Sequence, residues 1–484
     1  MVLRYIYKLL AILTCLVLLL LGLNYLYFYY QEKPEAGLSL PSLPALPKET
    51  RLMVIAPHCD DETLGCAGII RNVLASGGQV LVVVMTNGDG FTFAVKEQFH
   101  RLFLTSSDYI QSGYARQVET IHALRWLGLP DDHIIFLGYP DRGLKTIWAA
   151  TWDSSQPYRS RYTDSDHSPY TNSYRQNAPY AGETVLANLE QIMRDFKPTL
   201  ILSPHPADEH PDHAATWAFV ATSFLKIRNS GTALWPELYT YLIHRGDFPI
   251  PHGYKVEELL LPPRPLQKRQ NNQWYTYPLN SDNEFIKEQS LKEYVSQLRV
   301  PIMSNFLHSF IRKNELFEEV QIPVIKHEPS GVDLSILDSW QNQEPFLVNP
   351  RGVNPLGALE HGANVTAIAG AIQNNALWLH FHIPGFSKKR MRYHVSIVEY
   401  HGQQGTFQRE KKAFYFSSGD TNLPMDDIIR CQDDVVSKLP YPPQGLPDYF
   451  FIQILTKDIF GAISNHTVWQ PALIEQNMAN DSNR

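Results

Sequence analysis

The sequence is poor in cysteine and carries no excess of basic residues. Only four cysteines occur among 484 residues, at positions 15, 59, 66 and 431. Cys15 lies in an apolar stretch near the N-terminus, and the other three do not form an even set, which excludes a disulfide scaffold. Aspartate and glutamate (49) outnumber lysine and arginine (42), so the net charge is -7 and no nucleic-acid partner is expected. No repeat of fixed period is present.

The longest apolar run lies near the N-terminus. Leu9–Leu23 is almost wholly apolar, and four tyrosines follow between positions 25 and 30. The pattern predicts a single transmembrane helix within residues 1–30. Because Arg4 and Lys8 precede the run, the positive-inside rule places the N-terminus in the cytoplasm and the rest of the chain outside it, in the periplasm or at the cell surface. A cleaved signal peptide is the alternative, but no small-x-small site directly follows the run, which favours an uncleaved anchor.

After this anchor, the pattern predicts a stalk and then an α/β domain. Residues 31–50 contain four prolines and predict an extended stalk. Strands are expected at Leu52–Ile55, Val80–Met85, Ile134–Leu137, Thr199–Leu202 and Leu238–Ile243, and helices at Thr63–Ser76, Asp108–Leu127, Glu183–Phe196 and Ala214–Arg228. Such alternation predicts a parallel sheet with helices on both faces, over residues 51–328.

The character of the sequence changes after about Pro329. Runs that alternate apolar and polar residues, such as Ala376–His382 and Tyr393–Val398, are separated by turn residues. They predict an all-β, sandwich-like domain over residues 329–484. This domain either binds a glycan or packs against the α/β domain, and its sequence does not decide between the two.

Two clusters of histidines and carboxylates each follow a predicted strand. Pro57–Glu62 comes after Leu52–Ile55, and His205–His213 comes after Thr199–Leu202. Ligands of open α/β sheets bind outside the carboxyl ends of the strands. The two clusters together therefore predict a mononuclear metal site at this edge of the sheet.

Three residues of these clusters are candidate metal ligands: His58, Asp61 and His213. Two imidazole nitrogens and one carboxylate oxygen suit Zn²⁺ and leave a fourth position for water, although such a set also accepts Fe²⁺ or another divalent metal. Asp60, beside a ligand, is then the candidate general base. His210 is the candidate group that stabilises an oxyanion or protonates a leaving amine.

The same carboxylates have plainer alternative roles. Asp60 and Asp61 also suit the N-cap and first turn of the helix expected at Thr63–Ser76. Asp212 is a candidate catalytic residue that holds His210, or it caps the helix that begins at Ala214. His205 and Asp208 are interpreted as loop residues rather than ligands.

Five short segments resemble the motifs of the PIG-L (LmbE-like) de-N-acetylase family. They are Pro57-His58-Cys59-Asp60-Asp61-Glu62, Thr86-Asn87-Gly88-Asp89, Arg116 with Glu119, Phe136-Leu137-Gly138-Tyr139-Pro140-Asp141, and His210-Pro211-Asp212-His213. The resemblance covers about Arg51 to Ile243 and continues more loosely to about Leu316. Cys59 departs from the family pattern, which has proline there; proline supplies no ligand, so the metal set is unaffected.

The resemblance implies a Rossmann-like fold and a zinc-dependent enzyme that removes the N-acetyl group of an amino sugar and releases acetate. It implies the metal ligands His58, Asp61 and His213, the general base Asp60 and the oxyanion or acid residue His210. Residues expected to contact the substrate are Arg116, Asn87 and Asp141. Combined with the predicted anchor, it suggests an extracytoplasmic glycan or glycolipid as the substrate. The alternatives are a non-catalytic glycan-binding protein that retains the fold, and a hydrolase of another amide.

Overall fold

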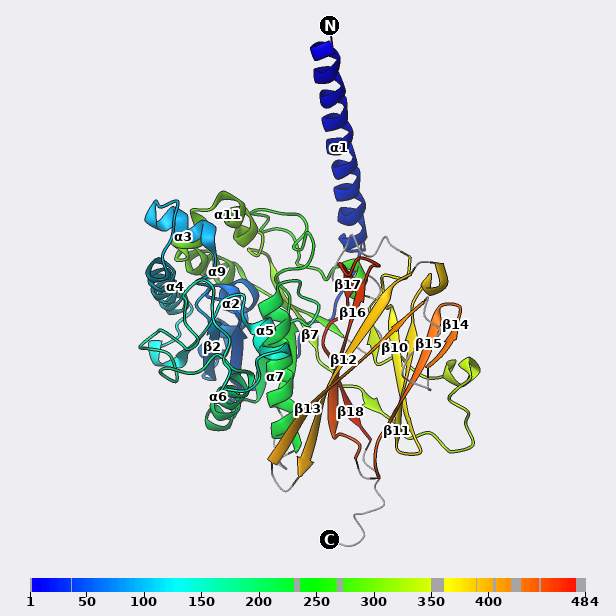
Figure 1. Cartoon of the computed structure of the whole chain (residues 1–484). Helices are drawn as coiled ribbons and strands as arrows, with labels where there is room; N and C mark the ends of the chain where they lie inside the picture. The colour runs from blue at the N-terminus through cyan, green and yellow to red at the C-terminus, as the bar shows by residue number, and fades with distance from the viewer. Residues whose placement is uncertain are drawn as a thin grey trace.

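The structure is a computed structural model. It describes residues 2–475, except 36, 230–235, 268–272, 350–360, 389, 404–405, 419–427 and 444. Figure 1 shows a lobe of helices around one sheet beside a lobe made mostly of strands, with the first helix, α1, extending away from both.

The first sheet contains seven strands: β1 (Arg51–Ala56), β2 (Gln79–Thr86), β3 (Ile134–Tyr139), β4 (Leu200–Pro204), β5 (Glu237–Tyr241), β6 (Trp274–Pro278) and β7 (Asn314–Glu319). Their order is β3-β2-β1-β4-β5-β7-β6. The pairs among β1 to β5 are parallel, whereas β7 is antiparallel to β5 and β6. The predicted parallel sheet is thus confirmed. From β1 the chain continues to β2 and β3 on one side of β1, and then crosses to β4 on the other side. The boundary between β1 and β4 is therefore a topological switch point.

Helices surround this sheet: α2 (Asp61–Ala75), α3 (Thr92–Phe99), α4 (Ser106–Trp126), α5 (Leu144–Ala149), α6 (Gly182–Phe196), α7 (Pro211–Asn229), α8 (Arg264–Gln267), α9 (Ser281–Lys292), α10 (Val295–Leu298) and α11 (Pro301–His308). A short 3-10 helix, η1 (Asp131–His133), precedes β3. Strand β1 is buried along nearly its whole length because its Val54 and Ile55 side chains belong to two separate core clusters. Burial on both faces explains why the strand is a continuous apolar run.

The remaining strands form two sheets. They are β8 (Val324–Ile325), β9 (Leu347–Val348), β10 (Ala367–Gln373), β11 (Ala376–His382), β12 (Arg392–Gln403), β13 (Thr406–Ser417), β14 (Ile428–Cys431), β15 (Asp434–Pro440), β16 (Tyr449–Lys457), β17 (Ile463–His466) and β18 (Gln470–Ile474), with 3-10 helices η2 (Leu337–Trp340) and η4 (Phe386–Lys388). Their orders are β14-β15-β11-β10-β9 and β13-β12-β16-β18-β8. Phe381 of one sheet lies 5.5 Å from Phe416 of the other, ring centre to ring centre. The sheets therefore share a core, as in a sandwich. The domain boundary predicted at 328/329 stays a prediction, and β8 already pairs with β18.

An aromatic cluster joins the two lobes. The ring of Trp148, at the end of α5, lies 5.1 Å from Phe219 of α7 and 5.4 Å from Phe451 of β16. Arg409 of β13 donates from Nη2 to the Trp148 carbonyl at 3.0 Å, and Lys411 Nζ donates to the Ala149 carbonyl at 2.7 Å. These cations bind the carbonyls that a helix leaves unpaired at its C-terminus. The β-rich lobe therefore holds the end of α5 in place.

The N-terminal region corrects one prediction. Helix α1 covers Val2–Glu32, but among the described residues no helix combines the length and the apolar character needed to cross a membrane. The almost wholly apolar run Leu9–Leu23 is 15 residues, about 22 Å of helix, whereas a span needs about 20 apolar residues. The predicted transmembrane anchor at 1–30, the membrane as a partner through it and the single-pass localisation with an extracytoplasmic catalytic domain are therefore wrong.

Part of the segment predicted as a stalk lies along the first sheet. The Leu43 N–H donates to the Thr276 carbonyl of β6 at 2.8 Å, and the Thr276 N–H donates to the Pro41 carbonyl at 2.9 Å. The Leu43 side chain is buried in the core beneath. Residues 41–43 thus extend the sheet edge at β6.

Candidate metal and active site

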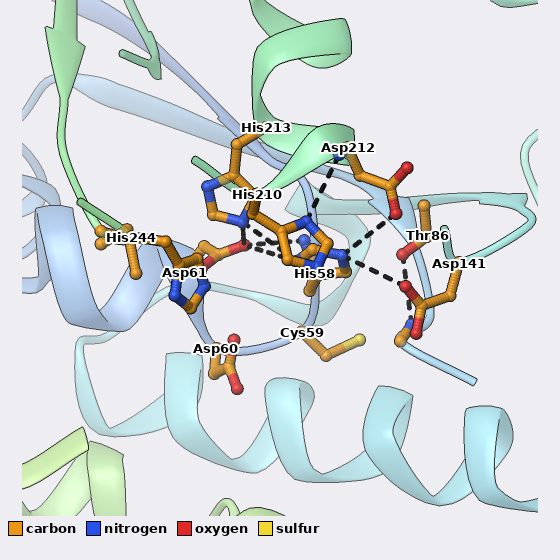
Figure 2. A network of polar contacts seen from close by, with 12 residues as sticks. His58, Cys59, Asp60, Asp61, Thr86, Asp141, His210, Asp212, His213 and His244 are labelled. Carbon is orange, nitrogen blue, oxygen red and sulfur yellow. Dashed lines mark hydrogen bonds and ion pairs between the residues drawn. The ribbon is translucent and has the colours of Figure 1, made fainter. Parts of the chain in front are cut away.

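The predicted site residues gather at the carboxyl ends of the parallel strands (Figure 2). His58 and Asp61 follow β1, and His213 lies in the first turn of α7 after β4. Asp141 follows β3. The loop after β1 is tied to the neighbouring strand because the Thr86 N–H donates to the Pro57 carbonyl at 3.0 Å. Three separate chain segments, which follow β1, β3 and β4, therefore deliver polar side chains to one point, as the switch-point rule requires.

His58, Asp61 and His213 form a compact triangle of ligand atoms. His58 Nδ1 lies 3.2 Å from Asp61 Oδ2 and 3.1 Å from His213 Nε2, and the latter two atoms are 3.1 Å apart. Two ligand atoms bound to one tetrahedral Zn²⁺ at its usual bond lengths are about 3.3 Å apart. The three atoms therefore fit the three protein corners of one such ion, and the site has the donor set that a divalent metal requires.

The electrostatics of the triangle also favour a cation. His213 is fully buried, and burial by itself lowers its pKa, but Asp208 and Asp61 raise the pKa of this imidazole to about 9. Asp208 Oδ2 lies 3.0 Å from His213 Nδ1. A metal-ligating histidine commonly donates its second ring N–H to a carboxylate, which fixes the ring and strengthens the ligand. Asp208 is placed to do this, although the sequence suggested only a loop residue.

Asp208 also connects the two loops after β4 and β5 around the triangle. Its Oδ2 accepts from the Ile243 and His244 N–H groups at 3.2 and 2.9 Å, and its Oδ1 accepts from the His210 N–H at 2.9 Å. Asparagine has only one acceptor oxygen for these two sets of donors. We expect Asp208→Asn to weaken metal binding about 10–100-fold and to lower the free energy of unfolding by about 1–3 kcal/mol, because a buried donor loses its acceptor. Isothermal titration with Zn²⁺ and thermal unfolding measure the two effects, and unchanged metal affinity would contradict the role given to Asp208.

Asp60 occupies the N-cap position of α2 but does not act as its cap. Its side chain accepts no capping hydrogen bond, and its backbone φ is 136°, a region that favours glycine. Its carboxylate instead faces Arg116 Nη2 at 3.1 Å. Burial raises the pKa of Asp60 to about 8, with Arg116 opposing the rise and Asp61 adding to it. A strained backbone that presents a carboxylate beside a metal site indicates function rather than helix capping.

Arg116 is buried and holds the Asp60 loop. Its Nη2 donates to the Cys59 carbonyl at 2.6 Å, and its Nη1 donates to the Gly88 carbonyl at 2.9 Å. Cys59 itself is a buried free cysteine. Arg116 also borders the cavity at the site, whereas Asn87 is fully buried and does not. Substrate contact by Arg116, Asn87 and Asp141 stays a prediction.

His210 and Asp212 lie beside His58, and His210 also offers a ligand atom within 4.8 Å of those of His58 and His213. The ring of His210 lies 4.6 Å from that of His58, and its Nδ1 accepts from the Asp212 N–H at 3.3 Å. Burial lowers the pKa of His210 well below its usual value, and the charges of His58 and His213 add to this. A neutral ring whose Nδ1 accepts carries its proton on Nε2, so His210 is a hydrogen-bond donor there.

Asp212 does not cap α7 as one sequence interpretation suggested. Its carboxylate accepts from the N–H groups of Arg142 and Leu144 at 2.5 and 3.0 Å, at the start of α5. Asp141 accepts from the Gly90 N–H at 2.9 Å. The nearest carboxylate oxygens of Asp141 and Asp212 lie 3.4 and 3.5 Å from His58 Nε2.

A cavity of about 170 Å³ opens at the site. His58, Asp60, Asp61 and His210 line one side, and Met303, Phe306 and Leu307 of α11 line the other. A larger cavity of about 520 Å³ lies between the two lobes, against Trp217 and Phe346, and is not lined by any of the predicted site residues.

His244 is a site residue that the sequence interpretation missed. It lines the small cavity, its ring stacks on Phe306 at 5.1 Å, and it offers a ligand atom within 4.8 Å of those of Asp61 and His213. Burial lowers its pKa to about 4, although Asp208 opposes this. The signal was available, because His244 directly follows the strand predicted at Leu238–Ile243, at the same sheet edge as the two clusters.

The parallel sheet, its switch point and the His/Asp triangle define the class: a doubly wound α/β protein with a candidate mononuclear metal site. Residues 53–224 match the PIG-L family model, described as GlcNAc-PI de-N-acetylase. The chain therefore carries a PIG-L family domain over these residues, and the resemblance inferred from the five motifs is confirmed.

Two curated relatives and one solved structure illustrate the similarity. A 1D-myo-inositol 2-acetamido-2-deoxy-alpha-D-glucopyranoside deacetylase of Mycobacterium sp. (strain KMS) is 32% identical over 168 residues, 34% of this chain and 47% of that protein. Its counterpart from Mycobacterium leprae (strain Br4923) is 29% identical over 185 residues, 38% of this chain and 52% of that protein. The N,N'-diacetylchitobiose deacetylase from Pyrococcus horikoshii aligns with a TM-score of 0.33 and 18% identity, covering 56% of this chain and 83% of that one. The chain thus spans about half the length of the curated relatives that it matches.

Proposed function

We propose that this protein is a metal-dependent hydrolase that removes the acetyl group from an N-acetylated amino sugar of a glycan or glycolipid. The observation that carries the proposal is the triangle of His58, Asp61 and His213 with a further carboxylate, Asp60, beside it. The PIG-L family domain and the names of the mycobacterial relatives support the same substrate class. We propose Zn²⁺ as the metal, with Fe²⁺ as the alternative that the donor set also accepts.

The residues around the triangle suit amide hydrolysis. A divalent ion held there would supply a Lewis acid for the amide carbonyl and would acidify a water molecule. Asp60 is placed to accept the proton of that water. His210 is placed to donate from Nε2 to the carbonyl oxygen as it gains negative charge, and Arg116 fixes the Asp60 carboxylate. Asp60 returns the proton to the leaving nitrogen as the C–N bond breaks, and the acetic acid formed ionises. Water and the amide thus yield acetate and a protonated amine on the sugar, so atoms and charge balance.

The size of the cavity supports a small reacting group. At about 170 Å³ it is below the roughly 300–1,000 Å³ of pockets that enclose a drug-sized ligand. An acetamido group with part of one sugar ring fits such a volume better than a whole oligosaccharide. Asp141 and Arg116 border the cavity and are the proposed contacts to the sugar, whereas the buried Asn87 would act by supporting them.

Acetate release from metal-replete, full-length protein tests this function. We expect N-acetylglucosamine, its inositol conjugate or N,N'-diacetylchitobiose to yield acetate and free amine in equal amounts. Chelation should abolish the activity, and stoichiometric Zn²⁺ or Fe²⁺ should restore it. N-acetylated amino acids serve as the comparison for a hydrolase of another amide. Failure to release acetate from every amino sugar, with one metal bound per chain, would favour a glycan-binding protein instead.

A further inference from the structure

A second group of ligand-capable atoms lies on the other side of the His58 ring. His58, Asp141, His210 and Asp212 each offer one ligand atom, and these atoms lie within 4.8 Å of one another. His58 Nδ1 faces the triangle, whereas Nε2, on the opposite edge of the ring, faces Asp141 and Asp212 (Figure 2). His58 therefore takes part in both groups through its two ring nitrogens, and His210 also offers a ligand atom within 4.8 Å of that of His213.

The second nitrogen of His58 has no hydrogen-bond partner. Only 8% of His58 is exposed, and its Nε2 is fully enclosed without a hydrogen bond. The carboxylate oxygens of Asp141 and Asp212, at 3.4 and 3.5 Å, are beyond the roughly 2.7–2.9 Å of a charge-assisted hydrogen bond. The ring nitrogen is buried and points between the two carboxylates, and both N···O distances are longer than a strong hydrogen bond. Ligand atoms around a shared cation are arranged in this way.

No lysine or arginine within the described parts of the chain pairs with the two carboxylates, and the His58 ring is the group between them. Asp141 is 4% and Asp212 0% exposed, and backbone N–H groups bind both. Two buried carboxylates that share one imidazole are costly unless a positive charge lies between them, which either a protonated His58 or a metal ion supplies.

We propose that His58 Nε2, Asp141, His210 and Asp212 form a second site for a divalent first-row metal such as Zn²⁺. Two nitrogens and two oxygens are a donor set that this metal accepts, and the 3.4 and 3.5 Å separations are close to the edge of about 3.3 Å of its tetrahedron. When both sites are filled, His58 bridges the two ions and releases its last ring proton. The second ion binds more weakly, because two dications then share one ring.

The second site is inhibitory. Four protein ligands leave no open position on a tetrahedral ion, which is typical of closed rather than catalytic sites. An ion held there uses His210 and Asp141, which the proposed function assigns to the oxyanion and the sugar. This consequence, unlike the site itself, rests on the proposed deacetylase activity. Acetate release should therefore fall as the second equivalent of metal binds.

Counting bound metal tests the site independently of activity. Full-length protein freed of metal is titrated with Zn²⁺, and free ion is removed by equilibrium dialysis before metal analysis. We expect two equivalents for the natural sequence and one for Asp141→Asn, whose amide oxygen still accepts from the Gly90 N–H. His213→Ala should lose the tighter equivalent and keep the weaker, and His58→Ala should lose both. Saturation of the natural protein at one equivalent, or two equivalents in Asp141→Asn, would overturn the proposal.

Electron paramagnetic resonance with Cu²⁺ in place of Zn²⁺ tests the bridge itself. Two Cu²⁺ ions joined by one imidazole ring are magnetically coupled, so the signal should lose intensity as the second equivalent is added. Asp141→Asn should show only the uncoupled signal. Two independent signals in the natural protein would place the second ion elsewhere and overturn the assignment, whether or not the protein releases acetate.

Discussion

Asp60→Asn should lower kcat for acetate release by about 10²–10⁴-fold, the range contributed by a positioned general base. The amide has nearly the same shape and its oxygen can still accept from Arg116, so the 3.1 Å contact to Nη2 survives. The ligand atoms of His58, Asp61 and His213 are untouched. We therefore expect the bound Zn²⁺ to remain at the level of the natural protein while turnover is lost.

Glu62→Gln is the matched control for this experiment. Glu62 is a fully buried carboxylate in the same turn, but its Oε1 accepts from Tyr294 and it does not line the cavity. Burial raises the pKa of Glu62 to about 7. Glutamine keeps the size of this side chain and an oxygen that can accept from Tyr294. Activity of Glu62→Gln should stay within tenfold of the natural protein. If Asp60→Asn also stays within tenfold, the general base is another group.

Much of the site followed from one rule applied to local sequence. The apolar runs before Pro57 and His205 predicted two strands, and parallel strands deliver their carboxyl ends to one edge. This rule brings His58 and His213 together across 155 positions of sequence, and the structure places their ring nitrogens 3.1 Å apart. The periodicity of the apolar residues and the order of the predicted elements were enough to predict this proximity, because the sheet is built from short, repeated strand–helix units.

The contacts that orient the ligands could not be predicted in the same way. Asp208 lies in a loop without periodicity, and its bonds to the Ile243 and His244 N–H groups depend on how the loops after β4 and β5 pack. Arg116 is similar: the sequence placed it among the expected substrate contacts, and could not predict that it reaches the carbonyls of Cys59 and Gly88. Sequence patterns indicate which face a residue occupies, but not which distant backbone group it meets.

The N-terminal helix and the β-rich lobe show two further limits. The apolar run Leu9–Leu23 and the tyrosines after it predicted a helix long enough to cross a bilayer, but no helix among the described residues combines the length and the apolar character that this requires. The sequence did not decide whether the β-rich lobe binds a glycan or packs against the α/β domain. Arg409 and Trp148, which join the two lobes, are far apart in sequence, so their contact could not be predicted. Their contact links β13 to the end of α5, whose first turn binds Asp212. The lobe thus has a structural role in supporting the site.

His213→Ala should weaken Zn²⁺ binding at the triangle by more than the 10–100-fold expected for loss of an orienting partner, because it removes a ligand itself. The variant should still fold. Asp208 keeps the N–H groups of His210, Ile243 and His244 as donors, so no buried carboxylate is left without a partner. The measurement is the affinity of the tighter metal equivalent, with thermal unfolding of the metal-free protein to verify the fold.

His205→Gln is the control for His213→Ala. It distinguishes the loss of a metal ligand from general damage to the loop after β4. His205 is equally buried and lies in the same loop, but its Nε2 bonds Glu318 at 2.6 Å and is not part of the triangle. Glutamine retains a donor for Glu318, so the tighter equivalent should keep its affinity even if the melting temperature falls. Asp61→Asn changes the ligand that α2 contributes to the triangle, and it should also weaken binding of the tighter metal equivalent. Because the three ligand atoms lie 3.1–3.2 Å apart, one ion contacts all of them, and unaltered affinity in both His213→Ala and Asp61→Asn would place the metal outside the triangle.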